Sequence, residues 1–145
     1  MATVTTDDYD VSQYNFVVHQ GTTFKRSIIY KDSAGVVMTL GTGASARMKV
    51  RKSYPATSRV ASYVASPVLD LGSSGTGATT IALVLTPLDG EVTINIPAGT
   101  MAAVPAGIYN YDLELTLGSG GSAGDSGDVI KLLDGLFEIR QEMTF

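Results

Sequence analysis

Apolar and polar side chains alternate in several short stretches of this chain, and residues 108–116 show the pattern most clearly. One parity holds Tyr109, Tyr111, Leu113 and Leu115, and the other holds Asn110, Asp112, Glu114 and Thr116. A period of two places successive side chains on opposite faces of a β-strand, whereas an amphipathic helix repeats about every 3.6 residues. The stretch therefore predicts a strand with one buried face and one exposed face.

Comparable stretches recur along the chain and are separated by Gly, Pro, Asn and Asp turn signals. We expect strands at 13–20, 22–31, 36–40, 45–52, early in 66–80, and at 80–87, 91–97, 108–117 and 129–145. Only residues 97–107 resemble a helical turn. About eight or nine strands with turns between them predict an all-β antiparallel sandwich or barrel. Residues 13–145 form its single domain, preceded by an extended N-terminal arm at 1–12.

Three connecting segments carry specific expectations. Residues 32–35 (DSAG) have the Asp and Gly of a tight turn. Residues 118–128 are a low-complexity Gly/Ser loop, which we expect to be mobile. Asp134-Gly135 interrupts the last strand and is compatible with a hairpin turn or with a bulge inside one long strand. Similar apolar content on both sides favours the bulge.

The two tyrosines of the 108–116 stretch allow two interpretations. Exposed beside Asp112, they could form an aromatic ligand platform. In immunoglobulin-like sandwiches, however, a Tyr near the start of one strand packs at a corner, and its hydroxyl bonds nearby backbone. A turn of a small residue and Gly usually leads into that strand, and here Ala106-Gly107 precedes Ile108 and Tyr109. We therefore predict an immunoglobulin-like antiparallel β-sandwich in which Tyr109, Tyr111, Leu113 and Leu115 are core residues.

Charge is distributed unevenly in this chain of net charge −4. Residues 25–59 carry eight of the ten basic residues and one acid (+7), and the remainder carries two basic and thirteen acidic residues (−11). The alternation in 45–52 puts Arg47, Lys49 and Arg51 on one outward face. This row could pair with Asp112 and Glu114 on a neighbouring strand, or it could face a protein partner. The overall acidity, with no interleaved aromatic side chains, argues against nucleic acid.

No catalytic, cofactor or metal site is predicted. The single histidine, His19, has no recognisable acid–base constellation and is expected to be an ordinary strand residue. Asp125 and Asp128 are too few oxygen ligands for a calcium loop. The chain has no cysteine, which excludes disulfides and thiolate metal sites. No apolar run reaches the roughly 18 residues of a membrane helix, and the polar start lacks a signal peptide, so no secretion or membrane partner is expected.

Several motifs together resemble a group of small structural proteins of tailed bacteriophages. They are GTTFKR (21–26), KDSAG (31–35), ARMKVRKSY (46–54), GIYNYDLEL (107–115) and LLDGLFEI (132–139). The resemblance covers about residues 13–142, and the longer 118–128 loop and the acidic leader depart from it. It implies an immunoglobulin-like accessory protein of the virion, made in the bacterial cytoplasm. No site residue can be transferred from it.

The expected function is therefore structural and not enzymatic. We expect a tail-associated adaptor at the baseplate, neck or fibre that docks on other virion proteins, as an oligomer or a symmetric array. The alternatives are a decoration or cement protein on the capsid, and a carbohydrate-binding module, which would need exposed aromatic side chains. The contact residues expected on the arm are Asp7, Asp8 and Tyr9, and on the basic row Arg47, Lys49 and Arg51. Aspartates in such an arm, here Asp7, Asp8 and Asp10, are most often simply solvated, and the alternative is docking on a basic neighbour such as the Arg47 row of another copy.

Overall fold

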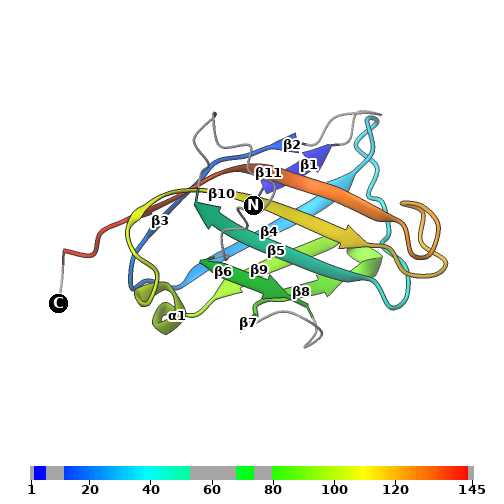
Figure 1. Ribbon diagram of the computed structural model, residues 1–145. Helices are drawn as coiled ribbons and strands as arrows, with labels where there is room; N and C mark the ends of the chain where they lie inside the picture. Colours follow the sequence, from blue (N-terminus) through cyan, green and yellow to red (C-terminus); the bar gives the residue numbers. More distant parts are fainter. Residues whose placement is uncertain (1, 6–11, 53–67, 74–79, 144–145) are drawn as a thin grey trace, which may run out of the picture.

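Two β-sheets packed against each other form the body of the protein, whose computed structural model describes residues 2–5, 12–52, 68–73 and 80–143 (Figure 1). The four-stranded sheet has the order β1 (Ala2–Thr5), β4 (Phe24–Lys31), β9 (Glu91–Ile96), β8 (Leu83–Thr86). The seven-stranded sheet has the order β2 (Ser12–Gln13), β11 (Val129–Arg140), β10 (Gly107–Thr116), β5 (Ser45–Lys52), β6 (Leu69–Gly72), β7 (Thr80–Ile81), and β3 (Phe16–His19) also pairs with β11. The predicted all-β sandwich is confirmed.

The alternating stretches became strands with the predicted faces. In β5, Ala46, Met48 and Val50 are buried, while the residues between them are only partly so. In β10 the buried residues are Tyr109, Tyr111, Leu113 and Leu115, as predicted. The buried faces of both sheets contribute to one continuous hydrophobic core. Since β5 and β10 pair antiparallel along their length, their outward side chains form one common surface.

The last strand is a single strand of 12 residues, so the prediction of one long strand is confirmed. The bulge lies elsewhere than predicted: the register shifts between Leu113↔Leu133 and Glu114↔Lys131, which leaves Leu132 as the extra residue. Leu132 and Leu133 are consecutive and both buried, and a bulge permits this because it adds one residue to one strand. Lys131 and Asp134 lie on either side of the bulge, so they share one outward face despite a spacing of three.

Two of the expected strands differ in the structure. Residues 80–87 do not form one strand, because β7 belongs to one sheet and β8 to the other. Between them the buried Ala82 donates its N–H to Gly72 O at 3.1 Å and accepts from Asn95 N–H at 2.8 Å, so it bridges the sheets. Residues 36–40 form no strand, only an isolated bridge from Val37 to Lys31. There the chain crosses between sheets, and Leu40 is buried in the core.

The Gly/Ser loop at 118–128 packs against residues 39–44 at one end of the sandwich. Gly118 N–H donates to Leu40 O at 2.9 Å, and Ser122 Oγ accepts from Thr39 N–H at 2.9 Å. A Cβ on Gly118 would collide with the backbone of Thr42, and one on Gly121 would lie 2.6 Å from Thr39 O. Close backbone approach therefore explains the glycines at positions 118 and 121.

The N-terminal arm is partly joined to the sandwich. Ala2–Thr5 forms β1 and pairs in parallel with Ile28–Lys31 of β4, and Ser12–Gln13 forms β2 beside β11. Asp7, Asp8 and Tyr9 lie outside the described residues. The predicted DSAG turn is present: Asp32 Oδ1 accepts the N–H groups of Ala34 and Val36, each at 2.9 Å, and Gly35 has a φ of 82°.

A single helical turn, α1 (Ala98–Ala102), follows β9 and leads into the start of β10, as predicted for residues 97–107. Opposite the helix, the chain turns from β8 to β9 through the 3₁₀ helix η1 (Pro87–Asp89). The Tyr109 hydroxyl donates to Pro105 O at 2.6 Å, and the tyrosine ring packs over Gly107. The predicted bond from this hydroxyl to nearby backbone is therefore present, and it fixes the entry of β10.

Replacing Tyr109 with phenylalanine is expected to lower the free energy of unfolding by about 1 kcal/mol, because the Pro105 carbonyl loses its donor while the ring remains. Urea unfolding followed by circular dichroism measures this. Tyr14→Phe is the matched control, expected to change stability by less than about 0.5 kcal/mol because Tyr14 is 45% exposed. Equal stability of wild type and Tyr109→Phe would show that the corner bond does not stabilise the fold.

Candidate functional site

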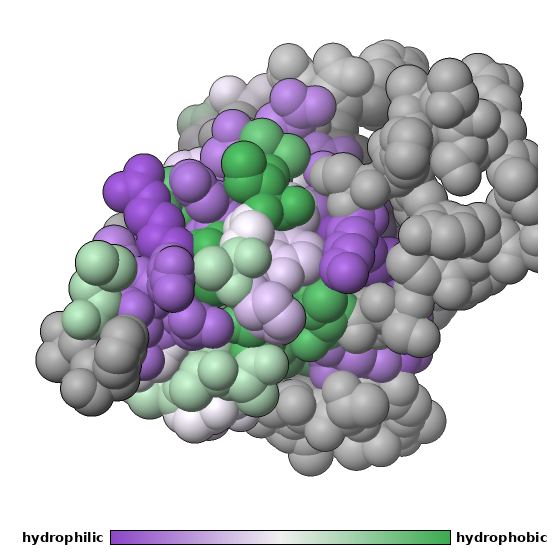
Figure 2. Space-filling view, turned by 60° about the vertical axis from the view of Figure 1, so that its left-hand side comes forward, coloured by the Kyte–Doolittle hydropathy of each residue, from purple (hydrophilic) through white to green (hydrophobic). Residues whose placement is uncertain are grey.

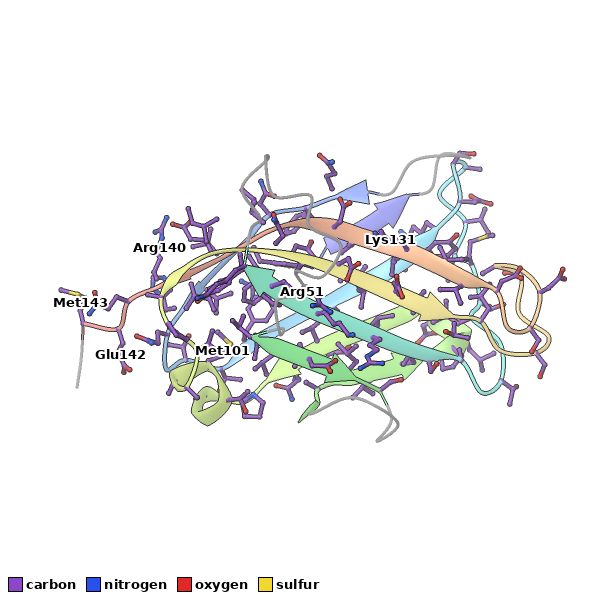
Figure 3. The ribbon with its side chains drawn as sticks, in the orientation of Figure 1. Arg51, Met101, Lys131, Arg140, Glu142 and Met143 are labelled. Carbon is purple, nitrogen blue, oxygen red and sulfur yellow. The ribbon has the colours of Figure 1, made fainter. Side chains whose placement is uncertain are left out.

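The outward side chains of β6, β5, β10 and β11 form a surface of alternating charge. We call it the charged face and define it by Arg47, Lys49, Arg51, Asp70, Asp112, Glu114, Lys131 and Asp134. The strand register places Arg47 opposite Glu114, and Glu114 opposite Lys131. In the next row Lys49 lies between Asp70 and Asp112. Figure 3 shows Arg51 and Lys131 on this face, which is turned toward the viewer.

The strands that carry the basic row and the acidic row are neighbours, as one of the two interpretations expects. The ion pairs found on this face, however, run diagonally to other strands and do not join the two rows. Arg47 Nη2 lies 3.1 Å from Asp70 Oδ2, and Lys131 Nζ lies 3.5 Å from Asp112 Oδ2. Among the described residues, Lys49 and Glu114 have no ion pair within 4 Å. Such partly exposed pairs contribute at most about 1 kcal/mol each, so the arrangement does little for stability.

The charged face is hollowed by three adjoining depressions. One of about 290 Å³ is lined by Lys49, Arg51, Lys52, Asn110, Tyr111, Asp112, Lys131 and Asp134. One of about 450 Å³ continues over Gly135 and Leu136 toward Gln13 and Asn15, and one of about 230 Å³ lies between Arg47 and Glu114. All three are open to solvent, and most of the residues that line them are polar or charged. They suit contact with another macromolecule's charged side chains better than enclosure of a small molecule.

Tyr111 lies beneath the charged face and joins it to the N-terminal part of the chain. Its hydroxyl donates to Tyr14 O at 2.5 Å. Burial raises the pKa of Tyr111 far above its usual value, and the nearby charges of Asp134 and Tyr14 raise it further. Asp134 Oδ1 is buried and has no hydrogen-bond partner among the described residues. The sequence offered no signal for Asp134, because the bulge at Leu132 alters the alternation of β11.

This raised pKa predicts a loss of stability at alkaline pH. The unfolded tyrosine ionises near pH 10, while folded Tyr111 keeps its proton above that pH. The contribution of Tyr111 to the free energy of unfolding is therefore fully present below pH 10 and is lost as the pH rises toward the pKa of the folded state. The loss is about 1.4 kcal/mol per pH unit from this group. Urea unfolding between pH 8 and 11 should show a shallower decline for Tyr111→Phe than for wild type. Identical slopes would contradict the assignment.

The predicted site residues have different outcomes. Arg47, Lys49 and Arg51 lie together on the charged face and are partly exposed. Tyr109 and Tyr111 are only 3% and 4% exposed, so neither can serve as a ligand platform. His19 lies exposed at the end of β3. Asp128 Oδ2 accepts the Asp125 N–H at 3.1 Å inside the loop. Sequence reasoning missed Asp70 and Lys131, which carry the ion pairs.

Among the residues that the structure describes, no three His, Asp or Glu side chains gather in a way that could hold a metal ion. Within the same residues, no helix has the length and apolar character needed to span a membrane. Figure 2 shows hydrophobic patches separated by hydrophilic side chains on the face it presents. The charged face is therefore the surface whose residue pattern most clearly suggests a role.

Comparison with known proteins found no matching family model and no matching curated protein.

Proposed function

We propose that the sandwich is immunoglobulin-like. In this assignment β4, β9 and β8 take the places of strands B, E and D, and β5, β10 and β11 take those of C, F and G. β6 then corresponds to C′, beside C. The bond from Tyr109 to Pro105 O, at the entry of the F strand, supports the assignment. The parallel pairing of β1 with β4 departs from the antiparallel pairing expected of a first strand.

We propose that this protein is a non-enzymatic structural component of a tailed-bacteriophage particle, attached to the tail at the baseplate, neck or fibre. The observation that carries the proposal is the charged face, where Arg47 and Lys49 lie opposite Glu114 and Asp112 on paired strands, with Arg51 next in the basic row. The motifs shared with small phage structural proteins supply the biological setting. The mechanism is docking of this face on neighbouring virion proteins.

Such docking depends physically on many copies of the protein binding to the same particle. One patch of exposed charges gives weak binding, because each exposed ion pair contributes little and is screened by salt. In a symmetric particle many copies dock at once, and the second and later contacts become intramolecular. Backbone pairing along β5 and β10 holds the charges in a fixed register, so little order must be gained on binding.

Particle incorporation tests the proposal. We expect the Lys49→Glu/Arg51→Glu variant to be at least roughly tenfold depleted from purified particles, measured by quantitative mass spectrometry, because two docking charges are reversed. Lys25→Glu/Arg26→Glu, which changes the net charge by the same amount at two exposed positions on the opposite sheet, is the control and should incorporate normally. Absence of the wild-type protein from purified particles, or equal incorporation of all three forms, would refute the proposed function.

The same measurement separates tail from head. A copy number equal to one symmetric ring supports the tail adaptor, whereas a copy number matching the capsid lattice supports the decoration protein. The arm is tested separately by replacing Asp7, Asp8 and Tyr9 with alanine, which leaves β1 intact. Full occupancy of this variant would exclude those three residues from the contact.

A further inference from the structure

We propose that the partner of the charged face is the same face of a second copy of this chain, related by a two-fold axis that runs parallel to the strands between β5 and β10. This inference rests on the proposed docking role of the face and identifies the molecule that docks there. It makes the contact isologous, so each residue pair across it occurs twice.

The first argument is charge balance. The eight residues of the charged face comprise four basic and four acidic side chains, so the face is neutral in a chain whose net charge is −4. The rest of the surface therefore carries the whole excess of negative charge and repels its like. Two copies can therefore approach through this face with no net charge repulsion between the two faces.

The second argument is the arrangement of positive and negative charges on the face, which selects the direction of the two-fold axis. A two-fold axis parallel to the strands places β5 of one copy over β10 of the other at the same height. Arg47 then faces Glu114 of the second copy, and Lys49 faces Asp112 of the second copy, because these pairs are in register within one chain. An axis perpendicular to the strands would place β5 over β5 and bring like charges together. Only the strand-parallel axis gives opposite charges.

The third argument is the state of the individual side chains. Lys49 and Glu114 are partly exposed, and neither forms an ion pair within 4 Å among the described residues. The proposed contact supplies both with partners. At the margin Asp70 approaches Asp134 of the second copy, which weakens the contact, although Arg47 already holds Asp70 at 3.1 Å.

The size of the charged face limits the affinity of the proposed dimer contact. Four strands spaced by about 4.8 Å, with residues 47–51 rising about 3.4 Å each, give a patch of roughly 19 by 14 Å. This is smaller than the roughly 800 Å² per partner of a stable complex. The isolated contact is therefore weak, and self-association must be measured at high protein concentration and low salt.

Charge reversal followed by mixing tests the inference on the purified full chain, by sedimentation equilibrium. We expect Lys49→Glu and Asp112→Lys each to raise the dimer dissociation constant at least roughly tenfold, because each variant alone places like charges in both symmetric contacts. An equimolar mixture should restore association, since Glu at 49 then meets Lys at 112 and the native Lys49–Asp112 contact is kept. Lys25→Glu should associate like wild type.

A double variant distinguishes loss of the contact from an effect of the substitutions on folding. The double variant Lys49→Glu/Asp112→Lys should associate with itself like wild type but not with wild type. Absence of self-association, or single variants that the mixture does not restore, would overturn the two-fold contact. If Lys49→Glu/Arg51→Glu is nevertheless lost from particles, the proposed function stands and the partner is another virion protein. If the mixture restores association but the wild-type protein is absent from purified particles, the two-fold contact stands and only the role in the particle is refuted.

Discussion

Replacing Phe137 with alanine is expected to lower the free energy of unfolding by about 3–5 kcal/mol. Phe137 lies in β11 with no exposed surface. Its ring centroid is 5.4 Å from that of Phe24 in the opposite sheet and 6.0 Å from that of Phe16. Removing the ring leaves a cavity where the two sheets meet, and edge-to-face aromatic contacts are lost as well. Urea unfolding at neutral pH measures the change.

The neighbouring residue provides the control for this substitution. Leu136 has the opposite parity and is 42% exposed, so Leu136→Ala should cost less than about 1 kcal/mol. A loss for Phe137→Ala no larger than for Leu136→Ala would mean that the aromatic cluster does not join the sheets. Because a domain is typically stable by only about 5–15 kcal/mol, the Phe137 variant is expected to be close to unfolding at growth temperature.

Replacing Gly135 with alanine is expected to cost about 2–3 kcal/mol, for two physical reasons. Its φ of 153° lies in a region that side-chain-bearing residues rarely adopt. An added Cβ would also collide with the backbone carbonyl of Tyr14 and lie 2.9 Å from Asn15 Oδ1. Both neighbours bind here: Tyr14 O accepts from the Tyr111 hydroxyl, and Asn15 Oδ1 accepts from Leu136 N–H. The substitution therefore loosens the N-terminal part of the chain from β11.

Alanine substitutions at two other glycines distinguish the cost of backbone strain from the cost of a steric collision. Gly120 has a φ of 79° but open space around it, so Gly120→Ala should cost only about 1 kcal/mol of backbone strain. Gly99 in α1 has open space and no positive φ, and alanine there should be neutral or slightly stabilising. The order of stability expected from thermal unfolding is Gly99→Ala, then Gly120→Ala, then Gly135→Ala. A Gly135 variant as stable as the Gly120 variant would show that the collision is relieved at no cost.

Local pattern was sufficient wherever one face of a strand is buried along its whole length. The strands β5 and β10 were predicted with their buried residues because Met48, Val50, Leu113 and Leu115 all keep to one parity. The bond at Tyr109 was predicted because both of its ends lie within four residues. Such features depend on near neighbours in the sequence, and alternation records them directly.

Local pattern was insufficient where the chain changes sheets or register. The segment 80–87 is rich in apolar and β-branched residues and contains no local signal for the crossing at Ala82. The bulge at Leu132 depends on how β11 pairs with β10. The sequence pattern therefore placed the bulge at Asp134-Gly135 instead. The pairing of Ala2–Thr5 with β4 joins segments more than twenty residues apart. In each case the deciding contact is distant in the sequence.

The sequence by itself therefore determined the all-β class, the buried parity of the central strands and the existence of one basic and one acidic row, because side-chain alternation is a local property. Only the tertiary structure decided that these rows are in register, that Asp70 and Lys131 take the ion pairs, and that Tyr111 binds the Tyr14 carbonyl. Register and diagonal pairing depend on how strands are placed side by side, and that placement follows from packing of the whole core.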